Sequence, residues 1–176
     1  SQQLPIRNQE IQIDSDVRQV RLIRLGSEQP IALRSKEQII GASQQNDNLN
    51  YYSGAGYQTL IWSNPTPGRY TLTEQFGPSD RILIDSDVRL DLAELPPTIS
   101  ADQTLGLSAS ITRKGNRIDT DTRQYFVAFG ANVDPLRSEG QALAIQIDSP
   151  AVGRSILTVQ SFDALYERQV QRVFEV

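Results

Sequence analysis

A repeated motif of this chain contains two pairs of aspartates. The residue type and spacing within each pair are compatible with binding a cation. The stretch IQIDSDVR (11–18) recurs as ILIDSDVR (82–89), with Asp14 and Asp16 in the first copy and Asp85 and Asp87 in the second. Carboxylates two residues apart at a strand end can bend towards one cation, and calcium prefers such oxygen ligands. One hypothesis is therefore a divalent-cation site, with Ca²⁺ as the cofactor, in each copy.

A structural role for the same motif is the alternative. Asp-Ser-Asp can end one strand and start the next, because the aspartate side chains accept Asx-turn hydrogen bonds from nearby backbone N–H groups. The motif lacks the glycine and distal glutamate of an EF-hand loop, and its spacing differs from the DxSxS of a metal-dependent adhesion site. A further DxD at Asp119 and Asp121 weakens the pattern as a metal signature. We favour the motif as a repeated joint where the chain enters a module.

A polar segment, GASQQNDNLNYYSGAG (41–56), is the candidate binding loop. Tyrosine supplies contact area in binding loops, while serine, glycine and asparagine adapt their hydrogen bonds to a ligand. The alternative is a long hairpin without a partner. The candidate binding residues are Asn46, Asp47, Asn50, Tyr51 and Tyr52.

The composition excludes several classes of site. The chain has no Cys and no His, which excludes disulfides, thiolate metal sites, a Ser-His-Asp triad and imidazole ligands. A net charge of −4 and a pI near 4.9 argue against nucleic-acid binding. The absence of Cys suits an oxidising compartment, where free thiols are a hazard.

Catalysis is not expected from this sequence. Two carboxylates can hydrolyse glycosides, but nothing in the spacing of the acidic residues selects a pair, so we expect no catalytic residues. The single tryptophan, Trp62, lies between apolar neighbours in a strand pattern. Core packing is the favoured interpretation of Trp62, and a sugar-stacking platform is the alternative.

Alternation of apolar and polar residues with period two runs through most of the chain and predicts strands. In 17–25, for example, Val20 and Leu22 fall on one side and Arg21 and Ile23 on the other. The other such segments are 57–63, 69–76, 105–113, 125–133, 141–147, 154–162 and 168–176. Residues 162–168 could form a short helix, but we favour a hairpin turn. The fold class is therefore predicted to be all-β, with antiparallel sheets.

The repeat divides the chain into two modules. A strand–Pro–Gly–Arg–strand pattern occurs in both halves, at 64–70 and at 148–155, and Pro96-Pro97 follows the second motif copy. Paired prolines cannot lie inside a central strand, so they indicate the early edge of a module. We predict two tandem immunoglobulin-like antiparallel β-sandwiches, the first over 1–89 and the second over 90–176.

The first half also resembles a known module. IDSDVRQVRLIRLGSEQPIALRS and GYQTLIWSNPTPGRYTL are similar to the sandwich module that follows von Willebrand factor A domains in secreted and envelope proteins. The chain departs from that pattern at Ser35-Lys36-Glu37, where the module has a Pro-x-Gly step. Residues of matching type are Asp14, Ser15, Val17, Pro30, Ile31, Leu33, Pro65, Pro67, Gly68 and Tyr70. The continuation, DVRLDLAELPPTISADQTLGLSASITRKGNRI, is similar to the second module of an uncharacterised family of proteobacterial envelope proteins.

The resemblance implies a periplasmic or cell-envelope location and no catalytic residues. We expect a binding or spacer module that mediates protein–protein interaction or positions a neighbouring domain of the same parent protein. The alternative is a cation- or carbohydrate-dependent adhesin module. No signal peptide or membrane span is visible, and because the sequence begins without Met we expect a mature protein or an excised piece.

Overall fold

The alternating segments form strands whose buried residues lie on one face. The computed structural model describes residues 1–176 except 45, 119–121 and 131–134. The described residues form β-strands and one short 3₁₀-helix, η1 (Ala42–Gln44), with no α-helix among them. Neighbouring strands in all the described sheets run antiparallel. The predicted all-β class with antiparallel sandwiches is therefore confirmed.

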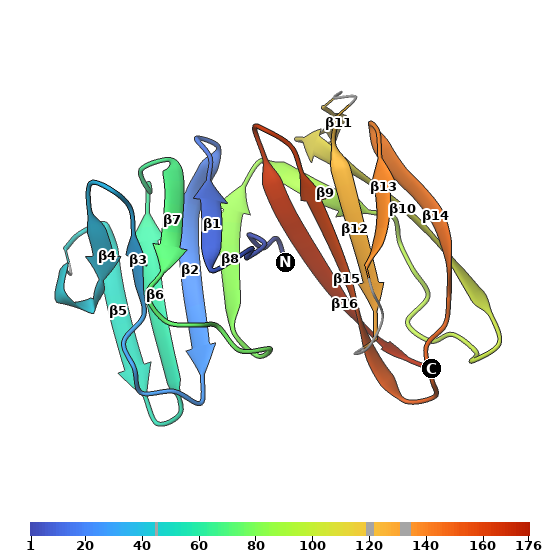
Figure 1. Ribbon diagram of the computed structural model, residues 1–176, viewed down its shortest axis with the longest axis horizontal. Coiled ribbons are helices and arrows are strands. Elements are labelled where there is room, and N and C mark those ends of the chain that lie inside the picture. The colour runs from blue at the N-terminus through green and yellow to red at the C-terminus, as the bar shows by residue number, and fades with distance from the viewer. Residues whose placement is uncertain (45, 119–121, 131–134) are drawn as a thin grey trace. The chain divides into compact units, whose positions relative to one another are not determined.

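The chain divides into two compact units, unit 1 (Ser1–Asp87) and unit 2 (Val88–Val176) (Figure 1). The boundary predicted between positions 89 and 90 falls inside strand β9 (Val88–Leu92). The last two residues of the second motif copy thus already belong to the first strand of unit 2. Pro96 and Pro97, predicted to mark the early edge of the second module, follow this first strand of unit 2.

Unit 1 has two described sheets, in the strand orders β1-β7-β3-β4 and β5-β6-β2-β8. Most residues between the sheets are apolar, and Val20, Leu22 and Leu60 are fully buried among them. Trp62 is 6 % exposed and packs edge-on against Tyr70, with ring centroids 5.5 Å apart. The core interpretation of Trp62 therefore agrees with its burial. The strands are β1 (Glu10–Ile13), β2 (Val17–Leu25), β3 (Ala32–Arg34), β4 (Ile39–Gly41), β5 (Leu49–Gly54), β6 (Tyr57–Ser63), β7 (Gly68–Leu72) and β8 (Arg81–Ser86).

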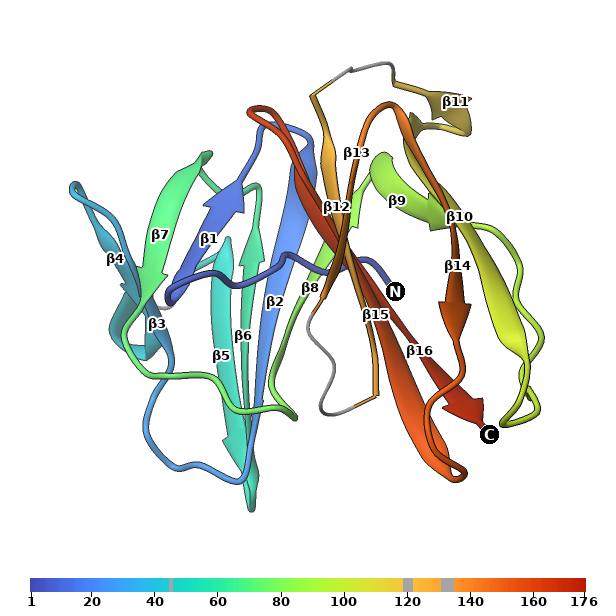
Figure 2. The same ribbon diagram turned by 45° about the vertical axis from the view of Figure 1, so that its right-hand side comes forward.

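Unit 2 also has two described sheets, which can be followed in Figure 2. In one sheet β10 pairs with β9, β11 and β14, and the other has the order β13-β12-β15-β16. Leu107, Ile111, Val127 and Val159 are among the core residues between these sheets. The remaining strands are β10 (Thr104–Arg113), β11 (Asn116–Arg117), β12 (Gln124–Phe129), β13 (Leu136–Glu139), β14 (Ala142–Asp148), β15 (Arg154–Phe162) and β16 (Glu167–Glu175).

The turn between β15 and β16 is a hairpin, as expected for residues 162–168. The two strands pair along their full length, from Arg154↔Glu175 to Phe162↔Glu167. Asp163 initiates the turn, because its Oδ1 accepts hydrogen bonds from the backbone N–H groups of Leu165 (2.8 Å) and Tyr166 (2.7 Å). The pairing of the strands as far as Phe162↔Glu167 leaves only 163–166 as the connection, which excludes the helical alternative for the segment.

Candidate functional site

The two copies of the IDSDVR motif, the second as far as Asp87, lie next to each other in unit 1. The first copy connects β1 to β2, and the second connects β8 to β9. Strands β2 and β8 are antiparallel neighbours, with Val17 opposite Ser86 and Gln19 opposite Asp85. The register shifts at the residue between them, Arg18. A bulge of this kind redirects a side chain, so the arginine of one copy faces the aspartates of the other.

Arg18 binds both aspartates of the second copy. Its Nη2 and Nε donate to the two carboxylate oxygens of Asp85 at 2.9 Å and 3.3 Å, and its Nη1 lies 2.9 Å from Oδ1 of Asp87. These hydrogen bonds to Asp85 and Asp87 raise the pKa of the Arg18 guanidinium above its usual value. We call Arg18, Asp85 and Asp87 the Arg18 clamp.

The aspartates of the first copy have a different environment. Asp14 is buried, its Oδ1 accepts a hydrogen bond from the Asp16 N–H at 3.1 Å, and its carbonyl accepts one from Val17 N–H at 3.2 Å. This is the Asx turn of the structural interpretation. In the described part of the chain no group of three or more acidic side chains gathers as a metal cluster. Asp119 and Asp121 lie outside the described residues. The Ca²⁺ hypothesis thus stays a prediction, and the structure adds no described ligand set to it.

Part of the candidate binding segment is a strand, β5 (Leu49–Gly54), which corrects the expectation of a loop over the whole of 41–56. Asn50, Tyr51 and Tyr52 lie in β5, which pairs with β6 along Leu49–Gly54. Asn46 and Asp47 lie exposed in the turn that precedes β5. A strand forms here in spite of the polar composition because β6 supplies the backbone partners.

The two adjacent tyrosines point to opposite faces of β5, as neighbours in a strand must. Tyr51 turns inwards, packs against the unit 1 core, and donates its hydroxyl proton to Gln58 Oε1 at 2.8 Å. Tyr52 is 54 % exposed on the outer face. The pair is therefore neither fully buried nor a continuous aromatic platform.

Tyr52 instead shares the outer face of this sheet with Tyr57 and Leu25. Tyr57 and Leu25 are opposite each other in the register of β2 and β6, and Gly54 of β5 is opposite Tyr57. A Cβ atom at Gly54 would lie 2.3 Å from the Tyr57 ring, so the ring lies across this glycine. Both Tyr57 (45 %) and Leu25 (49 %) are exposed. We call Leu25, Tyr52 and Tyr57 the outer aromatic patch.

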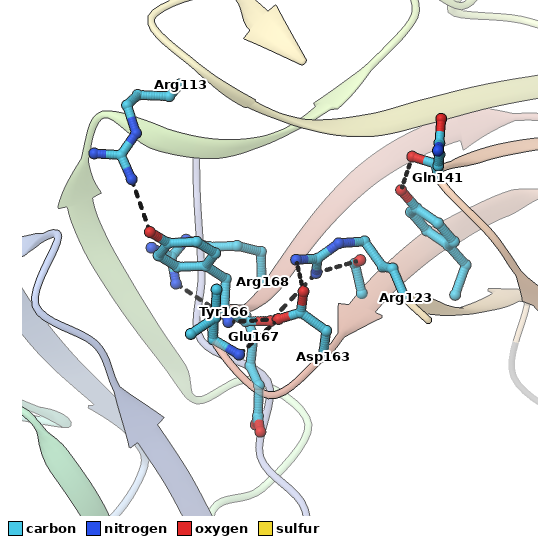
Figure 3. Close-up of polar contacts among 10 residues, drawn as sticks. Arg113, Arg123, Gln141, Asp163, Tyr166, Glu167 and Arg168 are labelled. Atoms are coloured by element: carbon cyan, nitrogen blue, oxygen red, sulfur yellow. Dashed lines mark hydrogen bonds and ion pairs between the residues drawn. The ribbon is translucent and has the colours of Figure 1, made fainter. Parts of the chain in front are cut away.

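Unit 2 contains a buried ion pair that the sequence patterns did not indicate (Figure 3). Arg123, just before β12, is fully buried, and its Nη2 lies 2.7 Å from Oδ2 of Asp163, whose side chain is 7 % exposed. Its Nη1 donates to Ser161 Oγ at 3.0 Å and to the Tyr166 carbonyl at 3.2 Å. Burial lowers the pKa of Arg123, and the charge of Asp163 opposes that shift.

A second buried arginine, Arg168, lies close to this pair. Its Nε donates to the Val88 carbonyl at 2.8 Å, and its guanidinium lies over the Tyr166 ring, 5.6 Å from the centroid. The Tyr166 hydroxyl in turn accepts a hydrogen bond from Arg113 at 2.7 Å. In Figure 3 Arg123, Asp163 and Tyr166 lie around the β15–β16 turn, and the contacts of Arg123 fix this turn to the sheet.

Comparison with known proteins gives no family. No family model matches the chain, and no curated protein matches it. Similar solved structures are a β-glucuronidase of Parabacteroides merdae (TM-score 0.40, 11 % identity, covering 94 % of this chain and 28 % of that one) and β-glucuronidase 3 of Bacteroides uniformis (TM-score 0.34, 10 % identity, covering 94 % and 26 %). The chain spans less than a third of either enzyme, and no activity is inferred from these scores. No described helix is long and apolar enough to cross a membrane.

Proposed function

We propose that this chain is a non-catalytic tandem module that positions neighbouring domains of a bacterial envelope protein. The observation that carries the proposal is the Arg18 clamp at the end of unit 1. Only Asp87 separates β8, the last strand of unit 1, from β9, the first strand of unit 2. That one residue is held by Arg18, so the backbone at the exit from unit 1 is restrained.

The repeated motif explains how such a joint is made. Each copy ends one strand and begins another, and the antiparallel pairing of β2 with β8 brings the copies together. The free edge of β8 is covered by the N-terminal segment, since Ile84 N–H donates to the Gln2 carbonyl and Leu4 N–H to the Ile82 carbonyl, each at 3.0 Å. Strand β8 therefore has backbone partners on both sides at 82–84, shortly before the exit point.

The Arg18 clamp is expected to affect orientation more than stability. Its three side chains are 39–63 % exposed, and exposed ion pairs add little to folding free energy because water and salt screen them. A bidentate arginine still defines a geometry. A spacer needs a restraint of this kind on the direction in which the backbone leaves unit 1.

Pulsed dipolar EPR tests the proposal. The chain has no Cys, so spin labels at Lys36→Cys in unit 1 and Val152→Cys in unit 2 would be the only labelled thiols. We expect a narrow distance distribution that Arg18→Ala broadens at least twofold, while the melting temperature hardly changes. Arg21→Ala is the matched control, because Arg21 is another exposed arginine of β2.

Two outcomes contradict the spacer role. One is a distribution that is already broad before Arg18 is replaced. The other is equal broadening by Arg21→Ala, which would mean that general surface charge, and not the Arg18 clamp, controls the joint. Raising the salt concentration should mimic Arg18→Ala, since screening weakens exposed pairs.

A second candidate function is docking of a protein partner on the outer aromatic patch. Exposed tyrosines are enriched at protein interfaces, and Leu25, Tyr52 and Tyr57 gather on one sheet face of unit 1. A benzophenone amino acid at position 52, in cells that make the parent protein, should give one discrete crosslinked product. The same group at Glu139, exposed in unit 2, is the control. Equal crosslinking at both positions would contradict a specific patch.

A further inference from the structure

A cavity of about 350 Å³ opens between the edge strands β4 and β5 of unit 1. Three loops surround it: the turn before β4, the turn before β5 and the segment between β6 and β7. Its volume lies within the range of small-molecule sites. Its lining consists of Gln38, Ile39, Ile40, Asn46, Asn48, Leu49, Trp62, Asn64 and Thr66.

The polar residues of the lining are uncharged. None of the described residues that line this cavity is acidic or basic, whereas a cavity of similar size in unit 2 includes Asp91 and Arg117. An ionic ligand would find no counter-charge in the unit 1 cavity and would lose hydration without compensation. The ligand that fits is neutral.

Carboxamide side chains dominate the polar part of the lining. Each carboxamide offers donors and an acceptor in one plane, a pattern that matches adjacent hydroxyl groups of a polyol. Asn48 and Asn64 are exposed, and neither side chain makes a hydrogen bond within the described part of the chain. Gln38 uses its nitrogen on the Tyr70 hydroxyl at 3.3 Å.

Backbone hydrogen bonds fix the chain at Asn48 and Asn64, the positions from which these carboxamides project. Asn48 N–H donates to the Asn46 Oδ1 at 2.8 Å, and the Asn48 carbonyl accepts from Ser63 N–H at 2.8 Å. Asn64 N–H donates to the Arg18 carbonyl at 2.8 Å. Asn64 has a φ of 51°, a left-handed conformation that asparagine tolerates better than most residues. Preorganised groups lose less entropy on binding.

We propose that this cavity binds a neutral saccharide. Free carboxamides would pair with sugar hydroxyls, and the apolar wall of Ile39 and Trp62 would cover the C–H face of the ring. Ile39 is 45 % exposed and Trp62 is 6 % exposed, so the indole contributes an edge and Ile39 the larger apolar contact.

Trp62 provides the readout, because it is the only tryptophan of the chain and it lines the cavity. Its emission would be recorded while the whole chain is titrated with neutral mono- and disaccharides: glucose, galactose, mannose, N-acetylglucosamine and their dimers. Glucuronate is the anionic control. We expect a saturable change with at least one neutral sugar and at least tenfold weaker binding of glucuronate.

Variants assign the binding to the cavity. Asn48→Ala combined with Asn64→Gly removes both free carboxamides and keeps the backbone conformation at position 64. This pair should weaken binding at least tenfold without shifting the melting temperature of unit 1. Asn116→Ala removes an exposed carboxamide in unit 2 and should leave the affinity unchanged.

Three results would overturn the proposal. The first is no saturable change with any neutral sugar, together with no retention on an array of neutral glycans. The second is binding that survives the Asn48/Asn64 double replacement. The third is tighter binding of glucuronate than of every neutral sugar, which would require a cationic site elsewhere.

Discussion

Asp163→Ala is expected to destabilise unit 2 by about 3–5 kcal/mol, the usual cost of removing one partner from a buried ion pair. The reason is that Arg123 would stay fully buried without its carboxylate, and an arginine cannot lose its proton to escape that cost. The β15–β16 turn would also lose the acceptor of two backbone N–H groups. A loss of this size is a large fraction of the stability of a small domain.

Unfolding in urea would be monitored with two spectroscopic signals. Far-UV circular dichroism reports on both units, whereas Trp62 emission reports on unit 1, which contains the only tryptophan. Asp163→Ala should shift the dichroism transition and leave the Trp62 transition in place. Asp163→Asn, which keeps the turn acceptor, should fall between Asp163→Ala and the unchanged protein. Asp148→Ala, an exposed aspartate of β14, is the matched control and should change little.

A decrease of less than about 1 kcal/mol in the unfolding free energy of unit 2 for Asp163→Ala would contradict a buried ion pair. A dehydrated guanidinium that loses its carboxylate partner costs more than that. An equal shift of the unfolding transition seen by Trp62 emission would show that the two units do not unfold independently. The two failures are distinguishable, since only the second involves the unit 1 signal.

Leu22→Ala is expected to give the opposite pattern, with unit 1 losing about 2–5 kcal/mol. Leu22 is fully buried in the unit 1 core and lies opposite Leu60 of β6 and Ile82 of β8. Its truncation leaves a cavity between two sheets that close packing prevents from collapsing fully. The Trp62 transition should therefore move to lower urea concentration.

Leu25→Ala is the matched control for Leu22→Ala, because Leu25 lies on the same strand with a 49 % exposed side chain. It should cost well under half as much. If Leu25→Ala and Leu22→Ala cost the same, the assignment of inner and outer faces of β2 would be wrong. The pair of leucines thus tests the register on which the outer aromatic patch also depends.

The strands that could be predicted from sequence are those with one buried face. Residues 17–25 and 57–63 coincide with β2 and β6, because period-two alternation records which side chains are withdrawn from water. Strands β3, β4 and β5 lack that signal. β3 and β4 are three residues long, and β5 is polar along most of its length. They form because neighbouring strands satisfy their backbone groups, which no local pattern records.

The Arg18 clamp was only partly visible in the sequence. The repeat identified the four aspartates, but it did not indicate that Arg18 of one copy binds Asp85 of the other, 67 residues away. The arginine that ends each copy was the available signal, since a cation of one copy can neutralise the anions of the other. The turn role of Asp14 followed directly from Asx chemistry.

The buried arginines could not be predicted, because arginine and aspartate are usually solvated. Arg123 and Asp163 are 40 residues apart in the sequence. The antiparallel pairing of β12 with β15, which places Gln124 opposite Phe162, brings them together. The amide-lined cavity has the same origin, because its residues come from strands β4, β5 and β6 and from three separate loops.

We propose that the Arg18 clamp restrains the joint between the two units. Residual dipolar couplings of the backbone N–H groups, measured on the whole chain in a weakly aligning medium, test it most directly. We predict that couplings from the strands of both units fit one alignment tensor, and that Arg18→Ala separates them into two. Couplings that already need two tensors of different magnitude before any substitution would contradict the account.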